Sequence, residues 1–151
     1  MKYRLFCTLF LVFYCTNILL SQTPPYHHYT SANGLPSSTV YDLIQDKSGY
    51  IWIATNNGLS RFNVTKFKNF GITDGLNSNT IVSVLEGDPG EIYIGNLEKG
   101  INFFKNGILS SYTLPKPSEF RIGDILYDKN KLYAHSVDGF LISYRNGMSE
   151  I

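Results

Sequence analysis

The chain has 151 residues, enough for one ordinary domain with a sizeable core. Its formal net charge is +1 and no basic or acidic run concentrates charge, so nothing points to a nucleic-acid partner or to an anionic membrane surface. Aromatic residues make up 15% of the chain, which favours β-strands because flat side chains pack well on a pleated surface.

The first 21 residues are predicted to be a signal peptide. Lys2 and Arg4 supply a positive start, and the mostly apolar stretch at 5–20 is short for a membrane span of about 20 residues. The small residue Ser21 predicts cleavage near this point and export to the periplasm. An uncleaved anchor is the alternative interpretation, and it would be the chain's only attachment to a membrane.

Both cysteines, Cys7 and Cys15, lie in this segment. A chain cleaved after Ser21 would contain no cysteine, which excludes disulfides, thiol catalysis and cysteine metal sites from the exported part. From residue 22 onward no stretch shows apolar residues at helical spacing, while short apolar runs bounded by turn residues recur. The exported part, residues 22–151, is therefore predicted to be all-β.

The stretch at 34–74 is predicted to be a small sheet of four short strands. The strands are expected at 39–45, 50–54, 59–62 and 66–70, separated by turns rich in Gly, Asn and Asp. The second strand, YIWIA, is apolar without alternation, so both of its faces should be covered. A four-stranded antiparallel sheet stacked between two others meets this requirement, and that arrangement is the blade of a β-propeller.

Most of the remaining chain repeats this pattern. Trp52 recurs as Tyr93, 41 residues later, and a weaker third copy has Tyr133. A period of about 40 to 45 residues is typical of propellers and other repeat arrays. The sequence predicts a second blade at 75–115 and an incomplete third blade at 116–151. The structural motif shared by the copies comprises Gly49, Trp52, Gly58, Phe62, Gly90, Tyr93, Gly100, Phe104, Tyr133 and Gly139.

The segment at 26–33 aligns with the end of the first blade and is predicted to form a leading strand. In ring-shaped propellers such a strand commonly completes the last blade. The predicted fold is thus a partial β-propeller of about three four-stranded antiparallel blades, the opening part of a ring that typically has 4 to 8 blades. Because repeat arrays gain stability from interfaces between neighbours, the expected partners are further blades or a second copy of the chain.

Two runs carry a family resemblance, LPSSTVYDLIQDKSGYIWIATNNGLSRFN and LNSNTIVSVLEGDPGEIYIGNLEKGINFF. They resemble the two-component regulator propeller repeat, whose pattern has a Leu-Pro opening, an acidic-x-x-Gly turn, a Trp-Ile-Gly-Thr-like strand, a Gly-Leu turn and a closing aromatic residue. The first run departs from the pattern at Ala54, where Gly is usual. The second departs at Tyr93, where Trp is usual.

The resemblance implies the N-terminal periplasmic sensor part of a bacterial sensor histidine kinase, whose kinase part has no counterpart in this chain. It implies a non-catalytic sensing or ligand-binding module of a two-component signal transduction protein, with a small molecule or a glycan as the signal. The chain itself is therefore not expected to be an enzyme. The alternatives are an exported propeller enzyme acting on glycans, as a lyase or a hydrolase, and a secreted propeller lectin.

No residue pattern predicts catalysis, a metal site or a cofactor. His27 and His28 are neighbours, so on a strand they would point to opposite faces and could not bind one metal together. His135 stands alone in the third copy. Carboxylates such as Asp42 and Asp46 are spread over the copies, as expected of turn residues. No catalytic, cofactor-binding or metal-binding residue is predicted, and the ligand-binding residues are unknown.

Trp52 and Tyr93 permit two interpretations. As exposed rings they would form a stacking platform for a sugar. As members of an apolar inner strand they would belong to the core between blades. Their place in the strand favours the core.

Overall fold

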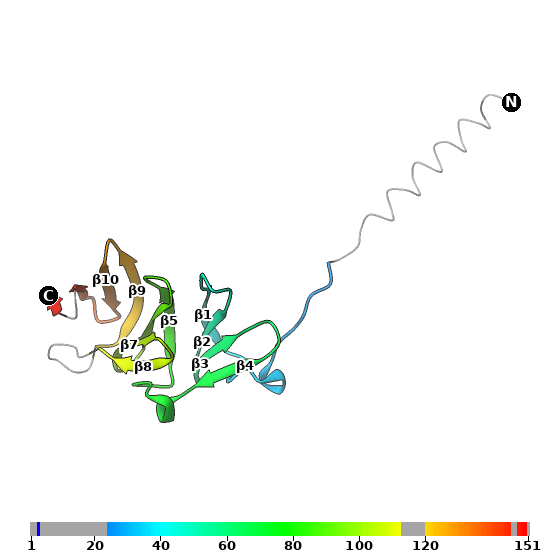
Figure 1. Cartoon of the computed structure of the whole chain (residues 1–151), viewed down its shortest axis with the longest axis horizontal. Helices are drawn as coiled ribbons and strands as arrows, with labels where there is room; N and C mark the ends of the chain where they lie inside the picture. Colours follow the sequence, from blue (N-terminus) through cyan, green and yellow to red (C-terminus); the bar gives the residue numbers. More distant parts are fainter. Residues whose placement is uncertain (1–2, 4–23, 113–119, 146–147, 151) are drawn as a thin grey trace.

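The computed structural model describes residues 3, 24–112, 120–145 and 148–150. These residues form twelve β-strands in three four-stranded antiparallel sheets, with short 3-10 helices between some of them (Figure 1). The prediction of an all-β fold of about three four-stranded blades is confirmed. No helix in this part of the chain is long and apolar enough to cross a membrane. The predicted signal peptide at 1–21 lies outside the described residues, except for Tyr3.

The first sheet corresponds to the first predicted blade, and its strands follow one another in space as they do along the chain. Its strands are β1 (Val40–Gln45), β2 (Ile51–Thr55), β3 (Gly58–Phe62) and β4 (Phe67–Phe70). The turn between β1 and β2 closes with a 2.9 Å hydrogen bond from the backbone N–H of Gly49 to the carbonyl of Asp46. Such short turns suffice because consecutive strands are antiparallel.

The second and third sheets repeat this topology. The second contains β5 (Ile81–Glu86), β6 (Glu91–Asn96), β7 (Gly100–Lys105) and β8 (Ile108–Ser111). The third contains β9 (Ile122–Asp128), β10 (Lys131–Ser136), β11 (Leu141–Arg145) and β12 (Met148–Glu150). The third sheet thus has four strands, with the short β12 as the last, in the region where the sequence predicts an incomplete blade at 116–151. Its first turn has no glycine, but Lys129 and Asn130 adopt positive φ angles there and close the hairpin.

In the leading segment residues 24–30 form no strand, and Ser31–Asn33 form the 3-10 helix η1. A leading strand at 26–33 that completes the last blade of a ring stays a prediction. The same turn recurs 41 residues later as η2 (Ile72–Asp74), so the two segments are equivalent although neither is a strand at this point. A strand needs a neighbour to accept its backbone hydrogen bonds, and none of the described strands pairs with this segment.

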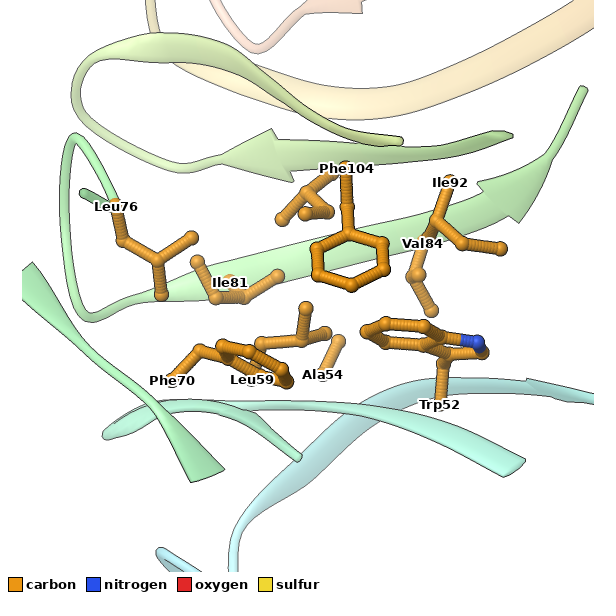
Figure 2. Packing of buried hydrophobic residues seen from close by; sticks show 10 residues of the cluster. Trp52, Ala54, Leu59, Phe70, Leu76, Ile81, Val84, Ile92 and Phe104 are labelled. Atoms are coloured by element: carbon orange, nitrogen blue, oxygen red, sulfur yellow. The ribbon is translucent and has the colours of Figure 1, made fainter. Parts of the chain in front are cut away.

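The first two sheets pack face to face over an apolar core (Figure 2). The buried residues of this core are Trp52, Ala54, Leu59, Phe70, Leu76, Ile81, Val84, Ile92, Ile94 and Phe104. Trp52 on β2 is 1% exposed, so the whole indole is removed from water. The interpretation of Trp52 as core between blades is therefore confirmed, and the alternative of an exposed sugar platform does not apply to it.

A second core lies between the second and third sheets. Its buried residues are Tyr93, Ile101, Phe120, Ile122, Ile125, Leu132, Ala134, Ile142 and Tyr144. The first strands of neighbouring sheets lie next to one another, since β1 contacts β5 and β5 contacts β9. The three sheets therefore form one continuous stack, as propeller blades do.

The outer faces of the stack expose apolar residues whose equivalents inside the stack are covered. Leu43, Val84 and Ile125 occupy the same position in β1, β5 and β9. Leu43 is 62% exposed, whereas Val84 and Ile125 are only 2% and 6% exposed because a preceding sheet covers them. At the other end Leu126 is 63% exposed, while its equivalent Leu85 packs on the second core.

Candidate functional site

Most landmark residues of the repeat lie in turns or in the cores between sheets, while Phe62 packs on Tyr29 and Phe67. The glycines all have positive φ angles: Gly49, Gly58, Gly90, Gly100 and Gly139. The aromatic landmarks of the first two sheets are buried: Trp52, Phe62, Tyr93 and Phe104. Tyr133 in the third sheet is half-buried and lines an open cavity of about 480 Å³ on the outer face of that sheet. These residues build the fold, and the polar groups that could bind a ligand lie elsewhere.

A row of polar side chains follows the first strands of the three sheets. Asp42, Ser83 and Asp124 are spaced 41 residues apart, and each lies beside a β-bulge. Asp42 accepts a hydrogen bond from the backbone N–H of Val84 at 2.9 Å, and Ser83 donates one to Asp124 at 2.7 Å. Each of these bonds joins one sheet to the next. The row therefore ties neighbouring blades together, and its carboxylates already accept hydrogen bonds from the protein.

Three aromatic rings from three strands meet at the first interface between sheets. The ring centroids of Trp52 and Phe70 are 6.0 Å apart, and Phe104 lies 5.0 Å from Trp52 and 5.6 Å from Phe70. The one polar atom of these three side chains, the indole Nε1, donates a hydrogen bond of 2.7 Å to the buried carboxylate of Asp46. The polar atom of these rings is therefore paired, and the guanidinium of Arg61 lies 5.5 Å from the Trp52 ring and 5.8 Å from the Phe104 ring.

At the second interface the same three positions hold tyrosines. By strand register and spacing, Tyr93, Tyr112 and Tyr144 are equivalent to the three aromatic residues of the first interface. The geometry is retained, since the rings of Tyr112 and Tyr144 are 5.6 Å apart at 64°, the same values as for Phe70 and Phe104. The second interface therefore places hydroxyl groups where the first has apolar rings.

These tyrosines line a cavity of about 160 Å³ between the second and third sheets, here called the tyrosine cavity. Its lining residues are Asp88, Glu91, Tyr93, Tyr112, Tyr127, Asn130, Leu132 and Tyr144. Tyr144 is 3% exposed, and its hydroxyl has no hydrogen-bond partner among the described residues. Buried polar groups are nearly always paired, because an unpaired one costs about 1–3 kcal/mol. The Tyr144 hydroxyl thus has unused hydrogen-bonding capacity at this cavity.

The tyrosine hydroxyls stay protonated at neutral pH. Burial raises the pKa of Tyr144 to about 12, and the neighbouring Tyr112 adds to the effect. The pKa of Tyr93 is also raised, mainly by burial and to a smaller extent by the neighbouring Tyr112 and Glu91. The pKa of Tyr127 is raised by burial and then by the negative charges of Asp88 and Glu91. The cavity is therefore lined by hydroxyl groups that can donate hydrogen bonds, in a negative local potential.

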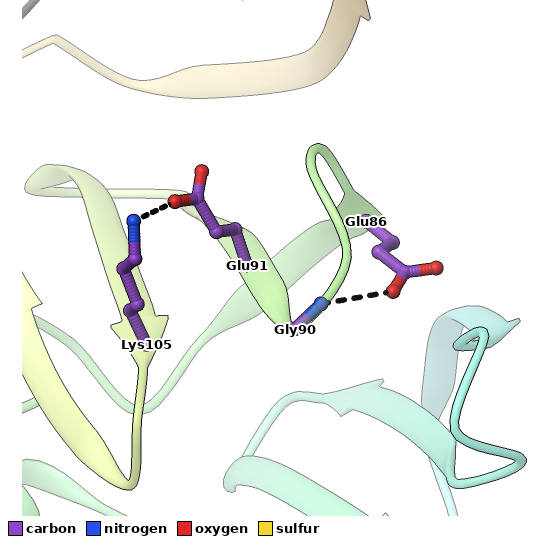
Figure 3. A network of polar contacts seen from close by, with 4 residues as sticks. All are labelled: Glu86, Gly90, Glu91 and Lys105. Carbon is purple, nitrogen blue, oxygen red and sulfur yellow. Dashed lines mark hydrogen bonds and ion pairs between the residues drawn. The ribbon is translucent and has the colours of Figure 1, made fainter.

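The turn between β5 and β6 and the first residue of β6 supply the two carboxylates of the tyrosine cavity. Asp88 is exposed, and Glu91 forms an ion pair with Lys105 on β7 (Figure 3). Glu86 accepts a hydrogen bond of 3.2 Å from the backbone N–H of Gly90, which holds the turn in shape (Figure 3). The cavity thus has two carboxylates on one side, of which one is balanced by a lysine.

The histidines do not share a site. His27 lies before the first sheet, with its ring 6.4 Å from that of Tyr29. His135 is exposed and lines the open cavity on the third sheet together with Asp124 and Asp128. Within the described ranges, no group of three or more His, Cys, Asp or Glu residues is placed to hold a metal ion.

Sequence reasoning missed the tyrosine cavity. Tyr112 and Tyr144 were not among the landmark residues, because aligning the copies emphasises what they share. The cavity could have been found from a difference between the copies, because the positions of Phe70 and Phe104 are occupied by tyrosine in the following copy. Such a change adds a polar group at a core position, so it requires a partner for that group.

Comparison with known proteins identifies the repeat. A sequence model described as two component regulator propeller matches residues 34–57. No curated protein matches the sequence. Among solved structures, the extracellular domain of the putative hybrid two component system BT4673 from B. thetaiotaomicron has 22% identity and a TM-score of 0.66, with 85% of this chain and 17% of that chain covered. The corresponding domain of BT3049 from B. thetaiotaomicron has 22% identity and a TM-score of 0.61, with 83% and 19% covered.

Virginiamycin B lyase from Staphylococcus aureus is more distant, with 20% identity and a TM-score of 0.51 over 72% of this chain and 41% of the lyase. At these identities the likenesses show the fold. The chain spans less than a fifth of the length of the two extracellular domains. It carries a two component regulator propeller repeat and builds it into a stack of propeller blades.

Proposed function

We propose that the chain is a non-catalytic sensing module of a two-component signal transduction protein. The observation that carries the proposal is the match of residues 34–57, the best-preserved copy, to the two component regulator propeller repeat. The similarity in fold to extracellular domains of two-component systems supports it. In this proposal residues 1–21 direct export to the periplasm and are removed near Ser21, and the signal is a small molecule or a glycan.

An exported propeller enzyme is the competing function. A glycan lyase or hydrolase needs ionisable groups that converge on one substrate and are free to react. The repeated carboxylates instead accept hydrogen bonds from their own surroundings, as Asp46 does from Trp52 and Asp42 does from Val84. These contacts favour a structural role for the carboxylates and a binding role for the module.

Binding without turnover tests this function. The chain is produced with its leader in a bacterium, recovered from the periplasm and sequenced from its N-terminus, which we expect near Gln22. It is then dialysed against a pool of small molecules and glycan fragments. We expect a compound to be retained and, by mass spectrometry, to be chemically unchanged. Products of cleavage or elimination would identify an enzyme, and retention of Met1 on a cytoplasmic product would contradict the export.

The partner we propose for each outer face of the stack is a further blade of the same repeat. The support is positional, because Leu43 and Leu126 are exposed at the two ends while their equivalents Val84 and Leu85 pack inside the stack. A neighbouring blade would cover both faces in the same way. Exposed apolar faces of this kind favour association.

The oligomeric state of the isolated chain tests the proposal that a further blade covers each outer face. We expect light scattering coupled to size exclusion to show oligomers or aggregates that diminish when Leu43→Lys and Leu126→Lys are combined. Ile108→Lys is the matched control, since Ile108 is 66% exposed but lies on the outer strand β8. A monodisperse monomer of the unmodified chain, with a sharp cooperative melt, would show that the faces need no cover.

A further inference from the structure

The two interfaces between blades share their geometry but differ in polarity. The first packs Trp52, Phe70 and Phe104 with its one polar atom paired to Asp46. The second has tyrosines at all three positions and leaves the hydroxyl of Tyr144 buried without a partner among the described residues. Packing alone does not require this hydroxyl, because phenylalanine fills the same position in the copy before it.

The residues that line the tyrosine cavity indicate the charge of its ligand. The described lining residues include the carboxylates of Asp88 and Glu91, and none of them is a lysine or an arginine. Lys105 forms an ion pair with Glu91, so the two carboxylates and this lysine together carry one net negative charge. Carboxylates and phenol oxygens are acceptors for an ammonium group, which has three N–H donors when primary. Aromatic faces also attract cations, so the rings add to the same preference.

The size and the position of the cavity limit the ligand to a small molecule. Its volume of about 160 Å³ corresponds to roughly five water molecules at about 30 Å³ each. Asp88 and Asn130 are exposed whereas Tyr144 is buried, so the cavity runs from the surface to the buried side chain of Tyr144. The volume suits a compound with one charged group and a short carbon chain.

We infer that the tyrosine cavity binds a small organic ammonium ion, held by the carboxylates of Asp88 and Glu91 and by the hydroxyl of Tyr144. The inference deepens the proposed sensing function by naming a class of ligand. The experiment below measures binding of an ammonium ion directly, so the ammonium inference can fail while the sensing proposal stands. Likewise, turnover of a glycan would overturn the sensing proposal without removing an ammonium site.

Calorimetric titration of the whole chain with two ammonium probes and one neutral probe tests the charge preference. The ammonium probes are ethanolamine and choline, and the neutral probe is 3,3-dimethyl-1-butanol, which has the shape of choline without its charge. We expect saturable binding of at least one ammonium probe and binding of the neutral probe at least about tenfold weaker, as for loss of one charge-assisted contact. If choline binds, equal binding of its neutral isostere would overturn the inference, and so would the absence of saturable binding by both ammonium probes.

Two substitutions locate the site. Tyr144→Phe removes the unpaired hydroxyl and keeps the ring, so we expect the affinity for the bound probe to fall about tenfold while the melting temperature stays equal or rises. Asp88→Asn lies on an exposed turn, which keeps the fold intact, and should lower the affinity to a similar degree. The matched controls are Tyr133→Phe, on the outer face of the third sheet, and Glu98→Gln, on an exposed turn; neither should change the affinity.

The outcomes separate a ligand site from a packing defect. If Tyr144→Phe stabilises the protein and leaves the affinity unchanged, the hydroxyl is a buried defect and the inference is wrong. If Tyr144→Phe fails to fold, Asp88→Asn decides between the two. An unchanged affinity in Asp88→Asn then overturns the site, and a weakened one supports it.

Discussion

Replacing Trp52 with alanine is expected to lower the free energy of unfolding by about 3–5 kcal/mol, the loss typical of large aromatic deletions in cores. The indole is 1% exposed and packs on Phe70 and Phe104 across the first interface. Its removal would leave a cavity bounded by two sheets that are held apart by the remaining side chains. It would also leave the buried carboxylate of Asp46 without the indole donor at 2.7 Å. Denaturant midpoints measured by fluorescence and circular dichroism give the comparison.

Tyr133→Ala is the matched control for this experiment. Tyr133 has the same position in the third copy as Trp52 has in the first, but it is half-buried and faces the open cavity on the outer sheet face. We expect a loss of less than half that of Trp52→Ala. His135→Ala, at an exposed position of β10, should change the stability least. Equal shifts of the denaturant midpoint for all three substitutions would show that burial between the sheets does not determine the stability.

A second large effect is expected for Gly58→Ala. Gly58 has a φ of 110°, a conformation that costs an L-residue about 1–2 kcal/mol. An added Cβ would also lie 2.5 Å from the backbone carbonyl oxygen of Phe70, which cannot move without breaking the pairing of β3 with β4. We therefore expect a total loss of about 3 kcal/mol or more, measured as the change in the denaturant midpoint.

Gly49→Ala separates these two causes. Gly49 has a φ of 87°, but an added Cβ there has no neighbour within 4 Å. Its substitution should therefore cost only the conformational part, about 1–2 kcal/mol. If both substitutions cost the same, the contact with Phe70 is relieved by a small movement and contributes nothing of its own.

The sequence predicts the sheets well because the information for them is local. Strand β2 is a run of apolar residues between turns that contain glycine, and the same run recurs at β6, so burial of both faces can be predicted without coordinates. The stack covers both faces of β6, whereas Ile51 and Ile53 on the outer face of β2 are only half-buried. The leading strand is the opposite case. Whether Tyr26 to Tyr29 forms a strand depends on a partner elsewhere in space, which a local pattern does not report.

The tyrosine cavity could not be predicted because it combines groups from distant segments. Asp88 comes from a turn, Tyr112 follows β8, and Tyr144 lies on β11 of the next sheet. Each tyrosine by itself is typical of a strand in a protein with many aromatic residues. Only the meeting of the strands shows that these hydroxyls share one space and that one of them is unpaired.

The row formed by Asp42, Ser83 and Asp124 gives the stack a direction. Each sheet presents one kind of face to the sheet before it and a different kind to the sheet after it, so the contact between sheets is heterologous, in the head-to-tail sense. A head-to-tail contact closes into a ring or continues as an open array, according to the rotation at each step. Gain or loss of a whole 41-residue unit would therefore still place faces of opposite kinds in contact, whereas insertion of part of a unit would place two mismatched faces against each other.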